Sequence, residues 1–61
     1  MKMKNIEISS TWKDGWGRIW RVIGKNKERN NIELVLVRNP SMRPLAVSCA
    51  SFHCWFILVD N

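Results

Sequence analysis

The sequence predicts an all-β fold for residues 1–61 as a single domain, either a small SH3-like barrel or a bent antiparallel meander of about 4–5 strands. Three observations indicate this class. Short runs rich in apolar, β-branched and aromatic residues recur, glycine- and proline-containing turns separate them, and the chain is compact in length. A three-stranded antiparallel sheet that carries a C-terminal helix is the alternative.

The first expected element is a β-hairpin with strands over Ile6–Trp12 and Trp16–Ile23. Asp14-Gly15 between apolar runs is a strong hairpin signal. A two-residue turn at this dipeptide would put Trp12 and Trp16 on opposite faces. A three-residue turn, with Gly15 in the left-handed region, unites the large apolar side chains on one face.

The three-residue turn is therefore preferred, and it fixes a register. Its predicted cross-strand pairs are Trp12 with Trp16, Ile8 with Trp20, Ile6 with Val22, and Glu7 with Arg21 on the other face. In this arrangement the tryptophans of the hairpin form the core. Trp12, Trp16 and Trp20 with Lys13, Arg18 and Arg21 could instead form a surface that binds single strands.

The middle of the chain alternates between loops and short strands. Gly24–Asn31 is expected to be a polar loop, and Ile32–Arg38 a third strand with both faces rather apolar. Two prolines within Asn39–Pro44 exclude a central strand there. Leu45–Ser48 follows as a short fourth strand, and Cys49–Ser51 as a brief helical turn.

The C-terminal run Phe52–Val59 has two readings. Its aromatic and β-branched content favours a strand that is apolar on both faces. A helix competes with that strand, because Ser48 could cap it and Phe52 and Phe56 would stack one turn apart.

No catalytic or metal-binding constellation is recognisable, so we expect no enzymatic activity, no cofactor and no metal. Cys49, His53 and Cys54 lie close together, but a structural zinc site needs four ligands at workable spacing. A disulfide would require a bend between the cysteines and an oxidising compartment. We instead expect Cys54 to be a small core residue and Cys49 to be partly exposed.

The formal net charge of +5 favours an anionic partner, either an acidic protein surface or nucleic acid. No apolar run is long enough to span a bilayer, and no signal-peptide core follows the basic N-terminus, so we expect a cytoplasmic protein without a membrane partner. A nucleic-acid surface would use the basic side chains of Arg18, Arg21, Lys25, Lys27, Arg29 and Arg38.

Apolar residues left over from the expected core predict a protein interface. A chain of 61 residues cannot easily enclose both sides of every strand. The expected interface, for a target protein or a second copy in a homodimer, consists of Ile19, Arg21, Val35, Val37 and Trp55.

The chain also resembles short accessory proteins of tailed bacteriophages and prophages. The pattern that carries the resemblance is Trp12-x-Asp14-x-x-Gly17-x-x-Trp20-x-Val22, then a strand, Arg43-Pro44 and Phe52-x-x-x-Phe56. The resemblance implies a non-enzymatic module that binds a bacterial host protein in the host cytoplasm and modulates or inhibits it. A small basic nucleic-acid-binding module is the alternative.

Overall fold

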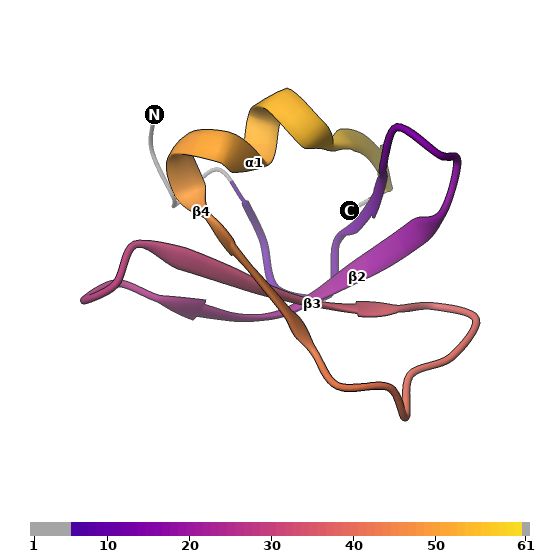
Figure 1. Ribbon diagram of the computed structural model, residues 1–61, viewed down its shortest axis with the longest axis horizontal. Helices are drawn as coiled ribbons and strands as arrows, with labels where there is room; N and C mark the ends of the chain where they lie inside the picture. The colour runs from indigo at the N-terminus through magenta and orange to yellow at the C-terminus, as the bar shows by residue number, and fades with distance from the viewer. Residues whose placement is uncertain (1–5, 61) are drawn as a thin grey trace.

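The computed structural model describes residues 6–60, and within them five strands and one short helix form (Figure 1). The strands are β1 (Thr11–Lys13), β2 (Ile19–Asn26), β3 (Asn31–Leu36), β4 (Leu45–Ser48) and β5 (Ile57–Asp60), and helix α1 is Cys49–Trp55. They confirm the mostly β character that the sequence predicts.

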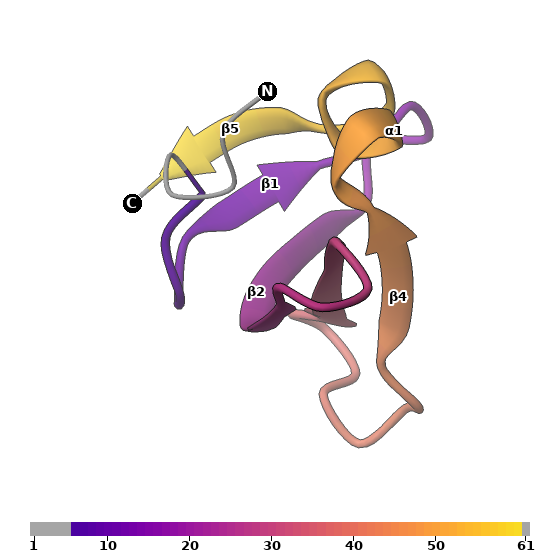
Figure 2. The same ribbon diagram turned by 90° about the vertical axis from the view of Figure 1, so that its left-hand side faces the viewer.

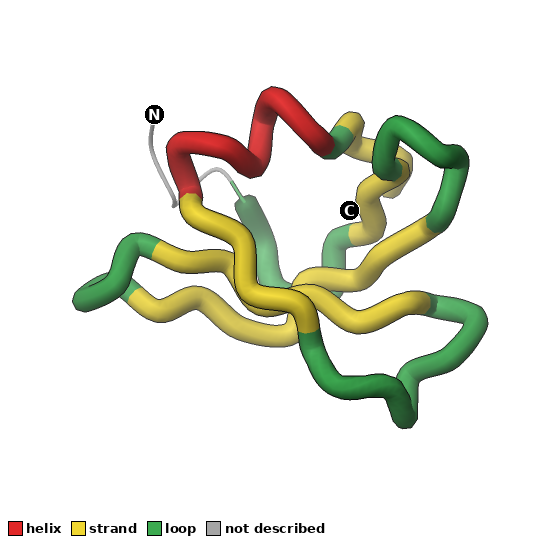
Figure 3. The backbone as a smooth tube through the Cα atoms, viewed as in Figure 1, coloured by secondary structure: helices red, strands yellow, loops and turns green. Residues whose placement is uncertain are grey.

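The strands form one antiparallel sheet in the order β4-β3-β2-β1-β5. Within residues 6–60, β4 and β5 are its two edges and do not pair with each other, so the sheet is strongly bent but open (Figure 2). Helix α1 connects these edges and lies over the inner face of the sheet (Figure 3). The sheet therefore has more strands than the three-stranded alternative, although a helix is present.

The core lies between α1 and the inner face of the sheet, and aromatic side chains fill much of it. The buried apolar residues are Ile6, Trp12, Trp20, Val22, Ile32, Leu34, Cys49, Phe52 and Phe56. Phe52 is fully buried and meets the Trp12 ring edge-on, with ring centroids 4.6 Å apart. It also stacks on Phe56 at 4.9 Å. Because a buried aromatic side chain removes roughly 150–250 Å² from water, these rings give a short chain a substantial core.

The predicted hairpin register is wrong. Trp12 pairs with Trp20, and the connection between β1 and β2 is the longer loop 14–18. Gly17 takes the positive φ of 83°, the role predicted for Gly15. The loop is longer because Asp14 organises it: its carbonyl accepts from Gly17 N–H at 3.1 Å, and its own N–H donates to Arg18 at 3.0 Å.

The first predicted strand is also too long. Residues 6–10 form a turn in which Ser10 N–H donates to the Glu7 carbonyl, and Ser9 has a φ of 75°. Thr11, not Glu7, therefore lies opposite Arg21. The buried hydroxyl of Ser10 accepts a hydrogen bond from Trp12 Nε1 at 2.8 Å, which satisfies the indole inside the core.

β3 and β4 agree with prediction to within about two residues, whereas β2 has the predicted length but begins and ends three residues later than predicted. β2 continues past Ile23 into the expected polar loop as far as Asn26. The turn that follows contains Asn30 with a φ of 57°. β3 covers Asn31–Leu36 and β4 covers Leu45–Ser48, the latter with the predicted bounds.

The C-terminal run forms the end of a helix followed by a short strand. Residues 49–55 are helical, and Ser48 caps the helix by accepting from Ser51 N–H at 3.3 Å. Phe56 has extended backbone, and β5 follows it. A continuous strand over Phe52–Val59 is therefore wrong, because the capped helix brings Phe52 over the sheet before the chain returns beside β1.

Candidate functional site

Asp14 is the polar centre of the β1–β2 loop. Its carboxylate accepts hydrogen bonds from the backbone N–H groups of Trp16 and Arg18, each at 2.9 Å. It also accepts from Arg18 Nε at 2.7 Å and from the buried indole Nε1 of Trp20 at 2.9 Å. One carboxylate thus fixes the loop backbone, a core tryptophan and a basic side chain together.

The hydrogen bonds to Asp14 stabilise its charged form. Burial acts to raise the pKa of this carboxyl, because the side chain is only 6% exposed. The donors from Trp20, Arg18 and Trp16 outweigh burial and lower the pKa of Asp14 from 3.8 to about 2. Asp14 is therefore a structural anion that is already satisfied, and it is poorly suited to act as a general base at neutral pH.

The same loop presents Trp16 at the surface. Trp16 is 75% exposed, which contradicts its predicted place in the core. The guanidinium of Arg18 lies 5.3 Å from the Trp16 ring and 5.5 Å from the Trp20 ring, within the range of cation–π attraction. Arg18 therefore supports the exposed ring from one side, while its own side chain stays about half exposed.

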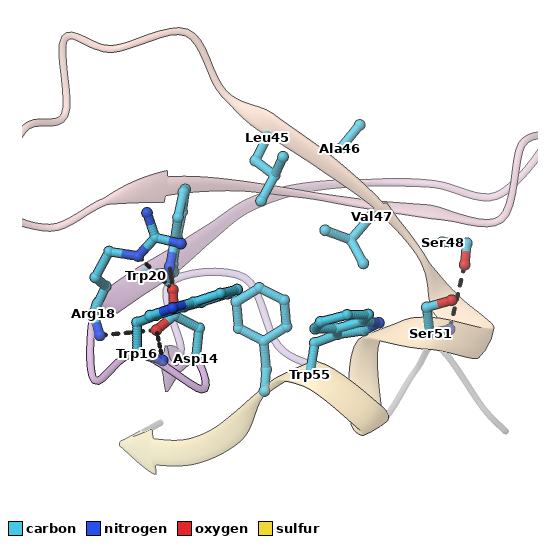
Figure 4. A pocket seen from close by; sticks show the side chains of 11 residues that line it. Asp14, Trp16, Arg18, Trp20, Leu45, Ala46, Val47, Ser48, Ser51 and Trp55 are labelled. Carbon is cyan, nitrogen blue, oxygen red and sulfur yellow. Dashed lines mark hydrogen bonds and ion pairs between the residues drawn. The ribbon is translucent and has the colours of Figure 1, made fainter.

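A groove runs between this loop, β4 and α1, and we call it the aromatic groove (Figure 4). Its lining consists of Asp14, Trp16, Arg18, Trp20, Leu45, Ala46, Val47, Ser48, Ser51, Trp55 and Phe56, and its volume is about 350 Å³. Leu45 and Val47 point into it from β4. Trp16 and Trp55 lie on the side opposite β4, and Trp55 is 58% exposed.

A second groove, which we call the basic groove, lies beside the other face of the same loop. It measures about 630 Å³ and is lined by Trp16, Gly17, Arg18, Ile19, Leu36, Val37 and Arg38. Trp16 and Arg18 belong to both grooves, so the loop lies between two largely apolar grooves, and the second of them also carries Arg38.

The residues predicted for a protein interface fall into two groups. Arg21 lies opposite Val35, and the Ile19 carbonyl accepts from Val37 N–H at 3.0 Å, so these four residues share the outer face of β2 and β3. Trp55 is on α1 and contributes to the aromatic groove, among side chains of the inner face.

The residues predicted for a nucleic-acid surface are also dispersed. Arg18 and Arg38 both line the basic groove. Lys27 and Arg29 belong to the β2–β3 turn, at the opposite end of β2 from the loop 14–18. Lys25 is half-buried near that turn. The six basic residues therefore do not make one continuous patch.

The cysteine prediction is reversed. Cys49 is 1% exposed and belongs to the core, whereas Cys54 is exposed, and no disulfide joins the two. The two cysteines differ in burial because they are five residues apart on α1, and side chains five apart point to different sides of a helix. His53 is exposed and packs edge-on against the rings of Trp12 and Phe52. Within residues 6–60, no three histidine, cysteine or acidic side chains cluster as a metal site would require.

Sequence reasoning missed the link between Asp14 and the exposure of Trp16. An aspartate that precedes glycine in a loop often accepts from backbone N–H groups a few residues further on, and this signal was available.

None of the helices formed by residues 6–60 has the length and apolar character to cross a bilayer. The chain matches no protein-family model, no curated protein and no solved structure.

Proposed function

We propose that this chain is a non-enzymatic binding module whose aromatic groove takes a segment of a partner protein. The observation that supports the proposal is the pair of tryptophans beside the groove, Trp16 at 75% and Trp55 at 58% exposed. Large exposed aromatic side chains in a largely apolar groove are costly in water unless they contact a ligand. Tryptophan is also among the residues that contribute most to protein interfaces.

The contacts that hold Trp16 and Trp55 in place favour a preformed binding surface. Asp14 fixes the backbone of the loop that carries Trp16, and Arg18 stacks on its ring. Trp55 ends a helix that is capped by Ser48 and anchored in the core by Phe52. A site that needs little ordering on binding loses less conformational entropy and binds more tightly.

The partner is proposed to be a bacterial protein, in line with the resemblance to phage accessory proteins. The net charge of +5 would favour an acidic partner and would make association faster at low salt. We further propose that the fold is an open variant of the SH3-like barrel. The strand order β4-β3-β2-β1-β5, with a short helix between β4 and β5, supports that relationship.

The test is selection of binders from a displayed library of random peptides, followed by titration of the recovered peptides. Trp55→Ala is expected to weaken binding by about 2 kcal/mol, roughly thirtyfold, because it removes an aromatic contact at the site. Ile57→Ala is the matched control, since Ile57 is 69% exposed but lies outside the groove. Equal affinities for the two variants would refute the groove as the binding site.

A further inference from the structure

The backbone of β4 has a free edge along the aromatic groove. β4 pairs with β3 on one side, and within residues 6–60 no strand pairs with its other side. Edge strands of this kind are templates for pairing with another chain, and native proteins often protect them with charges, prolines or bulges. β4 itself is Leu-Ala-Val-Ser and carries none of these.

The ladder between β3 and β4 identifies which groups are free. In an antiparallel pair, alternate residues direct both backbone polar groups toward the partner strand. Cys49 N–H donates to the Asn30 carbonyl at 2.7 Å, one step beyond the pair of Asn31 and Ser48. Counting back by twos, Val47 and Leu45 point their polar groups at β3, so Ala46 directs its N–H and carbonyl toward the open edge.

The groove and this edge fit one ligand together. Leu45 and Val47 point into the groove, whereas the Ala46 methyl group points away from it, so it is the Ala46 backbone that faces a ligand (Figure 4). Side chains of an extended segment alternate between two faces. A segment paired with β4 would therefore place every second side chain against Trp16 and Trp55.

We propose that the partner segment binds as an added β-strand along β4, with alternate apolar or aromatic side chains in the aromatic groove. The inference rests on the proposed function and specifies how its ligand is held. At the Leu45 end of the groove, Arg18 is paired with Asp14, whereas the exposed Arg43, two residues before Leu45, adds a positive charge beyond that pair (Figure 4). The segment therefore carries an acidic residue at that end, whereas a second copy of this basic chain would bring like charges together.

The test uses a peptide recovered from the displayed library and a series of its analogues, each methylated at one backbone nitrogen. Strand addition predicts that affinity falls about tenfold at alternate residues only, because alternate N–H groups pair with the edge. The Ala46 amide is expected to exchange rapidly in the free protein and to become protected when the peptide binds.

Two variants test the edge from the protein side. Ala46→Pro removes the N–H group at an edge position and is expected to lower affinity about tenfold. Ala46→Val keeps the N–H and is expected to bind more tightly than Ala46→Pro, and equal losses of affinity in the two variants would overturn the role of the Ala46 N–H. Thermal unfolding of both variants checks that each is folded. If Ala46→Pro does not fold, the methylated peptides and the amide exchange of Ala46 decide whether the strand is added.

The outcomes separate the two proposals. Binding that tolerates methylation at every position would overturn strand addition and leave the protein-binding function intact. A dimer paired through β4, or an oligonucleotide that protects the Ala46 amide in place of the peptide, would overturn the proposed occupant. Recovery of no binding peptide would refute the proposed function and the strand inference with it.

Discussion

Replacing Asp14 by asparagine tests how much of the fold depends on one carboxylate. Asparagine has nearly the same shape, so the change removes charge and one acceptor while it preserves volume. Oδ1 would still accept from the loop backbone. An amide NH₂ in place of Oδ2 would face two donors, the Nε of Arg18 and the Nε1 of Trp20.

The cost follows from those two lost bonds. A hydrogen bond to a charged group contributes about 1.5–3 kcal/mol, and an unpaired buried donor such as the Trp20 indole adds a desolvation penalty. We therefore expect Asp14→Asn to lower the free energy of unfolding by about 3 kcal/mol. For a domain of this size, that loss lowers the Tm by about 10–25 °C.

The assay is thermal and urea unfolding followed by circular dichroism and tryptophan fluorescence. Glu28→Gln is the matched control, because it removes an acidic charge from the exposed β2–β3 turn. A difference between the two variants of less than about 0.5 kcal/mol would refute the role assigned to Asp14. The indole N–H resonance of Trp20 provides a local readout, and it should move in the variant if the bond to Oδ2 exists.

The remaining predictions concern pH, capping, thiol access and the core. The pKa of Asp14 is lowered to about 2 in the folded state, so its carboxylate contributes about 2 kcal/mol to the free energy of unfolding above pH 3.8 and loses this contribution as the pH falls toward 2. Urea titrations at several pH values should show the loss. In Asp14→Asn this pH dependence should be absent. Ser48→Ala should cost about 1 kcal/mol in thermal unfolding through the lost helix cap, and a Tm unchanged within error would contradict the cap. A thiol reagent should modify Cys54 rapidly and Cys49 only after denaturation, whereas equal rates would contradict the burial of Cys49. Phe52→Ala should cost about 3–5 kcal/mol, much of the stability of so short a chain, and a cooperative melt close to that of the parent would contradict its central place in the core.

Elements that depend on local pattern could be predicted from the sequence. The alternation around Ile32 and Leu34 identified the third strand, because buried side chains recur at every second residue of a half-buried strand. Prolines on its C-terminal side marked the loop that leads to β4. The helix, which was the less favoured alternative for the tail, is correct for residues 49–55, where Ser48 is the cap, and Phe52 stacks on Phe56, which lies just beyond the helix.

The hairpin register could not be obtained in this way. The prediction assumed that all three hairpin tryptophans pack in the core, but Asp14 draws the loop backbone around its own carboxylate and turns Trp16 outward. The end of the tail failed for a different reason. Ile57–Asp60 is a strand because it pairs with Thr11–Lys13, and nothing local shows that pairing.

These two errors also explain why only part of the candidate site was predicted. Trp55 was singled out correctly as a surface residue, but its neighbour in the groove, Trp16, was assigned to the core. The groove depends on an arrangement of the β1–β2 loop, β4 and α1, and no single segment of sequence contains it.

The position of β1 between β2 and β5 has a consequence for biosynthesis. Its neighbour on one side, β5, comes from residues 57–60, so the sheet cannot be completed until that segment has left the ribosome. Before residues 49–56 have emerged, the indole of Trp12 lacks the ring of Phe52 and that of Trp20 lacks the ring of Phe56, so both remain available to chaperones. Pairing over so long a sequence separation also slows folding, which makes the nascent chain vulnerable to aggregation and proteolysis for longer than a helical chain of equal length.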